Sequence, residues 1–122
     1  MKFYICKHCG NIATKLTDHN TPLSCCGEVM SELVPNTKEA AVEKHKPVLV
    51  EENGKRYAIV GSTVHPMSEE HYIEWIVVDY GDHYRVHHLK PNDEPKVKVC
   101  RHCEPVDIYA YCNLHGLWKM DK

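Results

Sequence analysis

The chain has 122 residues, of which 43% are apolar and 26% are charged, and its formal net charge is −2 at pH 7. This length allows one ordinary domain, or one domain with a small annex. The near-neutral charge offers no basic surface for nucleic acid or an anionic membrane. The longest apolar run, Trp75–Val78, is far below the roughly 20 residues of a membrane helix, and residues 1–10 lack an apolar core of signal-peptide length. We therefore expect a soluble, cytoplasmic protein with neither nucleic acid nor membrane among its partners.

The first segment, residues 1–36, reads as short strands separated by turn-rich polar stretches. The expected strands are Lys2–Ile5, Asn11–Leu16 and Glu28–Leu33. Segments below about 40 residues rarely bury enough apolar surface to fold without a metal or disulfides. Because the chain carries seven Cys and no export signal is evident, metal binding is favoured over disulfides. We expect a small metal-binding domain here.

Residues 37–122 show the period-two pattern of an antiparallel β-sandwich. Thr37 is placed to cap a short helix over Lys38–Lys44. Asn53-Gly54 is a strong signal for a two-residue hairpin turn. In the longest strand, alternation assigns Ile73, Trp75 and Val77 to one face and Ile76 and Val78 to the other. The predicted strands are Pro47–Glu52, Lys55–Ser62, His71–Tyr80, Tyr84–Leu89, Lys96–Val99 and Val106–Tyr111.

A first set of candidate metal ligands lies in the first segment. Cys6 and Cys9 form a C-x-x-C knuckle, and 15 residues separate it from the vicinal pair Cys25 and Cys26. Four thiolates favour tetrahedral zinc or iron. A structural zinc ribbon is the usual interpretation of such a site, but zinc ribbons normally carry C-x-x-C twice. Adjacent ligands should distort the tetrahedron, and this feature favours iron.

A second set of candidate ligands is rich in histidine. His45, His65 and His71 lie at the ends of predicted elements, and Cys112 and His115 follow the last predicted strand. Zinc prefers four ligands in all, so five donors fit a six-coordinate ion that keeps one position for a small molecule. The remaining histidines are interpreted as ordinary surface residues: His8, His19, His83, His87, His88 and His102.

Several motifs, in order along nearly the whole chain, resemble the superoxide reductases. They are Glu43-Lys44-His45, His65-Pro66-Met67, His71-Tyr72-Ile73-Glu74-Trp75, Leu89-Lys90-Pro91 and Tyr111-Cys112-Asn113-Leu114-His115-Gly116. The four cysteines of the first segment resemble the desulforedoxin-like domain of the two-iron form of this family, the desulfoferrodoxins.

The resemblance implies a rubredoxin-like or desulforedoxin-like knot over residues 1–36, followed by an immunoglobulin-like β-sandwich over residues 37–122. It implies one iron on Cys6, Cys9, Cys25 and Cys26. It also implies a second, catalytic iron with His45, His65, His71 and His115 as equatorial ligands and Cys112 as the axial ligand. Proteins of this family reduce superoxide to hydrogen peroxide. They are typically cytosolic homodimers of anaerobes or microaerophiles, and rubredoxin-type proteins usually supply their electrons.

Two charged residues beside His45 gain candidate catalytic roles from the resemblance. Lys44 would add a cation near the open face of a centre that carries one net positive charge, and so attract anionic superoxide. Glu43 is the family's candidate sixth ligand after oxidation. Without His45 beside them, both would be interpreted as ordinary solvated helix charges.

Cys100 and Cys103 form a second C-x-x-C knuckle that is not part of the family pattern. With Cys112 and His115 they could make a zinc site of three cysteines and one histidine. That interpretation predicts a non-enzymatic two-zinc interaction module, but it leaves His45 and the other histidines unexplained. A simple electron-transfer iron protein is a third alternative. For the knuckle itself we expect a redox-labile thiol pair.

Overall fold

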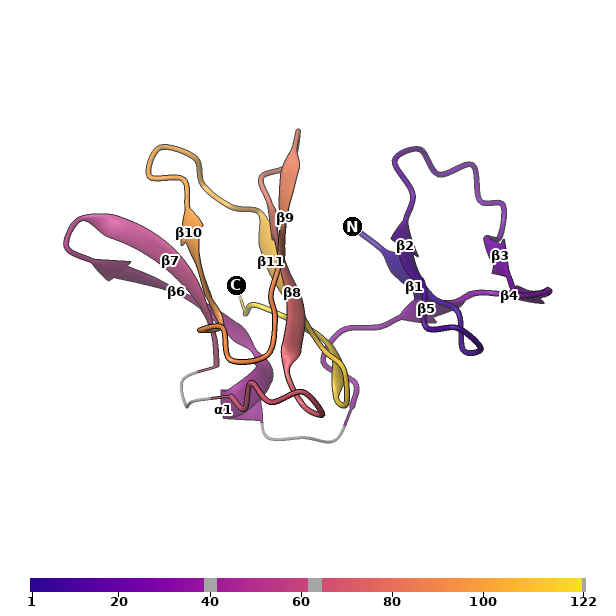
Figure 1. Cartoon of the computed structure of the whole chain (residues 1–122). Coiled ribbons are helices and arrows are strands. Elements are labelled where there is room, and N and C mark those ends of the chain that lie inside the picture. Colours follow the sequence, from indigo (N-terminus) through magenta and orange to yellow (C-terminus); the bar gives the residue numbers. More distant parts are fainter. Residues whose placement is uncertain (39–41, 62–64, 122) are drawn as a thin grey trace. The chain divides into compact units, whose positions relative to one another are not determined.

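The computed structural model describes residues 1–38, 42–61 and 65–121, without the side chains of Val42 and Glu43. The chain forms two compact units, unit 1 over Met1–Val34 and unit 2 over Pro35–Lys122 (Figure 1). Each unit is described by itself below.

Unit 1 is built from five short strands. β1 (Phe3–Ile5) pairs with β2 (Ile12–Thr14) and with β5 (Ser31–Leu33). β3 (Ser24–Cys25), which was not predicted, forms a hairpin with β4 (Glu28–Val29). The predicted strand Glu28–Leu33 is divided at Met30, whose amide donates to the carbonyl of Leu23 at 2.8 Å. β4 therefore pairs with β3, while β5 pairs with β1.

The apolar core of unit 1 is very small. In this unit, of which every residue is described, the buried apolar side chains are those of Phe3 and Cys6. Leu16 and Val29 are 87% and 64% exposed. So little burial does not offset the conformational entropy of about 34 ordered residues. The fold of unit 1 therefore depends on other interactions, as its composition predicts.

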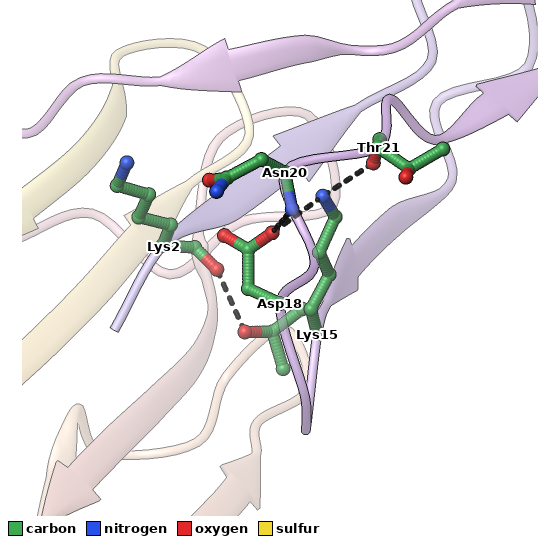
Figure 2. A network of polar contacts seen from close by, with 6 residues as sticks. Lys2, Lys15, Asp18, Asn20 and Thr21 are labelled. Atoms are coloured by element: carbon green, nitrogen blue, oxygen red, sulfur yellow. Dashed lines mark hydrogen bonds and ion pairs between the residues drawn. The ribbon is translucent and has the colours of Figure 1, made fainter.

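Polar contacts hold the long loop between β2 and β3. Figure 2 shows Lys15 reaching back across this loop, where its Nζ donates to Asp18 Oδ1 at 3.0 Å and to the carbonyl of Thr21. Asp18 Oδ1 also accepts from the amide of Asn20 at 2.8 Å. The Asn20 amide and the Lys15 charge lower the pKa of Asp18. The exposed positions of these groups make the network a local clamp of modest energy.

Unit 2 contains two antiparallel sheets that face each other (Figure 1). One sheet has the order β10 (Lys96–Val99), β7 (Lys55–Val60), β6 (Pro47–Glu52). The other has the order β12 (Gly116–Lys119), β11 (Asp107–Cys112), β8 (Ile73–Asp79), β9 (Tyr84–His88). The predicted sandwich is confirmed. So is the hairpin turn at Asn53-Gly54, where φ is 52° and 76°, as a type I′ turn requires.

The core of unit 2 lies between the two sheets. The set of β8 residues that faces this core differs from the predicted set at one residue, Ile73. The buried side chains of the core come from both sheets: Ala58, Val60, Ile73, Ile76, Val78, Val97, Val99, Ile108, Ala110 and Cys112. Ile73 packs with Ile76 and Val78, so its predicted place beside Trp75 is wrong. The reason is a shift in register, because Trp75 pairs with Tyr111 but Ile73 pairs with Cys112. This bulge reverses the alternation at its start.

A single helical turn, α1 (Val42–His45), stands at the end of the sandwich where β8 begins and β11 turns into β12 (Figure 1). The helix was predicted over Lys38–Lys44, and residues 39–41 of that range lie outside the described residues. Among the described residues, no helix has the length and apolar character needed to cross a membrane.

Candidate metal centres

The four cysteines of unit 1 come together as predicted. The ligand atoms of Cys6, Cys9, Cys25 and Cys26 all lie within 4.8 Å of one another. The Sγ atoms of Cys9 and Cys25 are 3.6 Å apart, and those of Cys25 and Cys26 are 3.9 Å apart. Four sulfurs about 2.3 Å from one ion at tetrahedral angles would be separated by about 3.8 Å. The cluster therefore has the dimensions of a tetrahedral thiolate site.

The backbone explains how two adjacent cysteines reach one point. Cys26 and Gly27 are the central residues of the β3–β4 hairpin, with φ of 53° and 77°. These values are those of a type I′ turn. Positive φ is rare for a residue that carries a side chain, and here it turns the Cys26 sulfur toward that of Cys25. The opposed directions expected for a vicinal pair are thereby avoided.

Hydrogen bonds to sulfur give the thiols of Cys6 and Cys26 unequal acidity. The amide of Cys9 bonds to the Cys6 sulfur and, against the opposing effect of burial, lowers the pKa of that thiol to about 6. Hydrogen bonds with Cys9 and Cys25 raise the pKa of Cys26 to about 12. The second and later thiols therefore need a cation to ionise, because each new thiolate repels those already present.

The histidines of unit 2 form a square. Neighbouring rings in the order His45, His65, His71, His115 and back to His45 are nearly perpendicular, with interplanar angles of 82°, 75°, 76° and 84° and centroids 4.7–4.9 Å apart. The opposite rings of His45 and His71 are 6.3 Å apart and nearly parallel, at 26°. This order and spacing are those of four imidazoles around one point.

The nitrogen atoms that face this point fit an ion. His45 Nε2 lies 3.0 Å from His115 Nδ1. Two nitrogens about 2.1 Å from one ion at a right angle are also about 3.0 Å apart. His65 Nδ1 is engaged by the carbonyl of Pro66 at 2.6 Å, which leaves Nε2 toward the centre. The Nε2 atoms of His65 and His71 are buried without a hydrogen-bond partner, a costly state that a metal ion would relieve.

Burial disfavours the protonated form of two of these imidazoles, those of His65 and His71. Burial lowers the pKa of His65 to about 4, opposed in part by its bond to Pro66. Burial, followed by the charges of His115, His45 and Lys44, lowers the pKa of His71. Neutral imidazole is the form that binds a metal. The site is therefore ready to bind a cation at neutral pH.

Cys112 supplies a sulfur to the same group. It is fully buried and forms a cluster with His45, His65 and His71 in which all ligand atoms lie within 4.8 Å, and its Sγ is 3.9 Å from His115 Nδ1. Burial raises the pKa of the Cys112 thiol, while the amides of Leu114 and His115 bond to the sulfur and lower it. The two amides therefore compensate in part for a thiolate in the core.

Two residues that the sequence did not single out as site residues support this geometry. Trp118, which is 1% exposed, stacks on His45 with centroids 5.1 Å apart, and its Nε1 donates to the carbonyl of His115 at 3.0 Å. Asn113 accepts from the amide of Tyr72 and donates to the carbonyl of Glu70, both at 2.9 Å. Asn113 thus ties the Cys112 loop to the loop that carries His71. In the sequence, the feature that could have indicated a supporting role for Trp118 is an aromatic residue three positions after the ligand His115.

The two candidate catalytic residues lie in α1. Lys44 is exposed beside His45, and its charge contributes to the lowered pKa of His71. The backbone of Glu43 belongs to the same turn, but its side chain lies outside the described part of the chain. The charge of Lys44 therefore reaches the histidine group, while its expected attraction of superoxide stays a prediction.

The rival zinc site is not formed. Cys112 belongs to the histidine group, and neither Cys100 nor Cys103 belongs to a group of potential metal ligands within residues 1–38, 42–61 and 65–121. Of the histidines interpreted as surface residues, five are exposed. The exception is His87, which is half-buried with its Nε2 shielded from solvent.

Comparison with known proteins agrees with this site. The family model described as Desulfoferrodoxin matches residues 37–121. The chain belongs to the desulfoferrodoxin family. The desulfoferrodoxin homolog of Archaeoglobus fulgidus is 45% identical to it over 120 residues, which are 98% of this chain and 95% of the relative. The desulfoferrodoxin of Nitratidesulfovibrio vulgaris is 43% identical over 122 residues, with 98% and 95% covered.

A solved structure extends the similarity to the whole fold. The superoxide reductase from Treponema pallidum superposes with a TM-score of 0.75 at 26% identity, covering 98% of each chain. The four-cysteine group and the group of histidines with one cysteine match the two iron centres of desulfoferrodoxins.

Proposed function

We propose that this chain is a superoxide reductase, which adds one electron and two protons to superoxide and releases hydrogen peroxide without forming dioxygen. The observation that carries the proposal is the square of four imidazoles with the sulfur of Cys112 in the same cluster. Five donors leave one place on a six-coordinate ion for a small substrate. When bound there, ferrous iron supplies the electron.

Several residues prepare the reaction. His45, His65 and His71 would ligate through Nε2 and His115 through Nδ1, because those atoms face the centre. Cys112 would ligate as a thiolate held by the amides of Leu114 and His115. A thiolate ligand would increase the electron density on the ion and so favour transfer of an electron to the substrate.

Charge near the site favours an anionic substrate. The exposed ammonium of Lys44, close enough to influence His71, would attract superoxide and raise its rate of encounter. Protons for peroxide would come from solvent, to which Lys44 beside the site is exposed. We assign Glu43 the role of a ligand that replaces departed peroxide after oxidation, on the strength of its place next to Lys44 in the family motif.

The first segment, residues 1–36, fits an accessory redox role. We assign residues 1–36 to a domain with iron on Cys6, Cys9, Cys25 and Cys26, and residues 37–122 to the catalytic domain. Ferrous iron with four thiolates would carry two net negative charges, which repel superoxide and suit an electron store. A rubredoxin-type protein as electron donor, a homodimeric state and a cytoplasmic location complete the proposal.

Metal analysis and a superoxide assay test this function. We expect two irons per chain, and superoxide consumption with one hydrogen peroxide formed per superoxide while an electron donor is present. Cys112→Ser should abolish the activity and leave the four-cysteine iron in place, because it removes a ligand to the catalytic ion alone. Cys100→Ser is the matched control, since it removes a thiol outside both centres, and it should keep full activity. Two zincs per chain, or dioxygen as a product, would refute the proposal.

A further inference from the structure

The Cys100–Cys103 knuckle has no part in either metal centre, yet its two thiols are closely placed. Their Sγ atoms are 2.7 Å apart, and both residues are half-buried. A disulfide bond is about 2.05 Å long, so a small movement of the side chains would bring the two sulfurs to bonding distance. The groups of potential metal ligands found among the described residues do not include this pair.

The backbone of the knuckle is held from both sides. The amide of Cys100 donates to the hydroxyl oxygen of Tyr80 at 3.1 Å. Arg56 donates to the carbonyl of Cys103 at 3.4 Å and also binds both carboxylate oxygens of Glu104, at 3.2 and 3.3 Å. These contacts fix the turn between the two cysteines and so reduce the entropy lost when the thiols are joined.

The two thiols differ in acidity and lie at the wall of a hollow of about 540 Å³. The hydrogen bond between the sulfurs, the amide of His102 and the charge of Arg56 lower the pKa of Cys100. The same sulfur–sulfur contact, burial and the charge of Asp82 raise the pKa of Cys103. Cys100 is thus the better thiolate, and Cys103 stays protonated beside it, which are the roles of an attacking and a resolving cysteine.

We propose that Cys100 and Cys103 form a redox-active dithiol site that hydrogen peroxide oxidises to an intramolecular disulfide. The Cys100 thiolate attacks one peroxide oxygen, the O–O bond breaks, and with one proton the products are a sulfenic acid and water. The Cys103 sulfur then displaces the hydroxyl group from Cys100, releasing a second water. One peroxide thereby takes two electrons from the pair, and a dithiol reductant restores the thiols by exchange.

The inference rests on the proposed function for the source of the oxidant, because superoxide reduction produces hydrogen peroxide on this same chain. The chemistry of the pair does not depend on that function. The test therefore adds hydrogen peroxide directly, to the iron-loaded protein after its iron has been oxidised, so that ferrous iron does not consume the reagent.

In the wild-type protein, one peroxide per chain should convert Cys100 and Cys103 from alkylatable thiols to a linked pair. Mass spectrometry should find this pair two hydrogens lighter, and dithiothreitol should restore both thiols. In Cys103→Ser, the sulfenic acid should persist on Cys100 and be trapped by dimedone. The matched variant Cys100→Ser should give little adduct at Cys103, because its less acidic thiol is the poorer nucleophile.

Three results would overturn the proposal. They are free thiols at both positions after peroxide treatment, equal dimedone trapping in the two single variants, and a zinc ion bound by the pair in the purified protein. The double variant with Ser at both positions should keep both irons and normal superoxide reduction. A wild-type protein that shows the peroxide response but does not reduce superoxide would count against the proposed function alone.

Discussion

Trp118 offers a sharp test of how the histidine square is held. Its indole stacks on His45 at 5.1 Å and donates to the carbonyl of His115 at 3.0 Å, so one side chain supports two adjacent corners. Trp118→Phe keeps an aromatic ring but leaves that carbonyl without its donor. Loss of a buried hydrogen-bond partner costs about 1–3 kcal/mol, and loss of such support for metal ligands costs about 10–100-fold in metal affinity.

Trp75 offers a matched control. It is 8% exposed, and it stacks with its ring centroid 5.5 Å from that of Tyr111, which is not a metal ligand. Trp75→Phe should lower the free energy of unfolding but leave metal affinity at the histidine site near that of the wild type. Urea unfolding followed by circular dichroism gives the first quantity, and competition with a chelator gives the second. If both variants lose affinity equally, or if Trp118→Phe loses stability alone, the positioning role of Trp118 is refuted.

Four further perturbations address the charges and the two centres. Lys44→Ala should slow the second-order reaction with superoxide and make its rate less dependent on ionic strength, because an absent cation no longer attracts the anion. Glu43→Ala should leave that rate nearly unchanged and should instead alter the visible absorption spectrum of the oxidised protein. Cys9→Ser should bleach the four-cysteine centre, while a chemically reduced sample still forms peroxide from superoxide. Burial lowers the pKa of His65 to about 4 from 6.5, so the unfolded chain binds this proton more strongly. Unit 2 of the metal-free protein should therefore lose about 2 kcal/mol of stability from this group between pH 7.5 and pH 5. Unfolding followed by tryptophan fluorescence, compared with His65→Gln, measures that difference, and equal pH dependence of the two proteins would contradict it.

The ligand groups could be predicted from sequence because their residue types are chemically specific. Cys6 with Cys9, and Cys25 with Cys26, are close in sequence, so local turns bring each pair together. The histidine square is different, since His45 and His115 come from opposite ends of the sandwich sequence and meet only through the fold. In that case the family motifs, rather than local spacing, indicated the set.

Two of the short strands were not predicted from the sequence. β3 has two residues and depends on the positive φ of Cys26, a conformation that cysteine seldom adopts. β12 begins at Gly116, whose φ of 80° allows the tight return from β11. Neither strand is long enough to show a period-two pattern, and the pairing of each with its neighbour is visible only in the structure.

The error at Ile73 has a consequence for the site itself. Strict alternation from Ile76 and Val78 would turn Ile73, and His71 two residues earlier, away from the core. The register shift between Trp75 and Ile73 instead turns Ile73 inward, where it is fully buried and pairs with Cys112. His71 lies in the bend just before β8, and it joins Cys112 in one group of ligands. The irregularity that breaks the period-two pattern thus lies directly beside the centre, in keeping with the frequent occurrence of β-bulges near active sites.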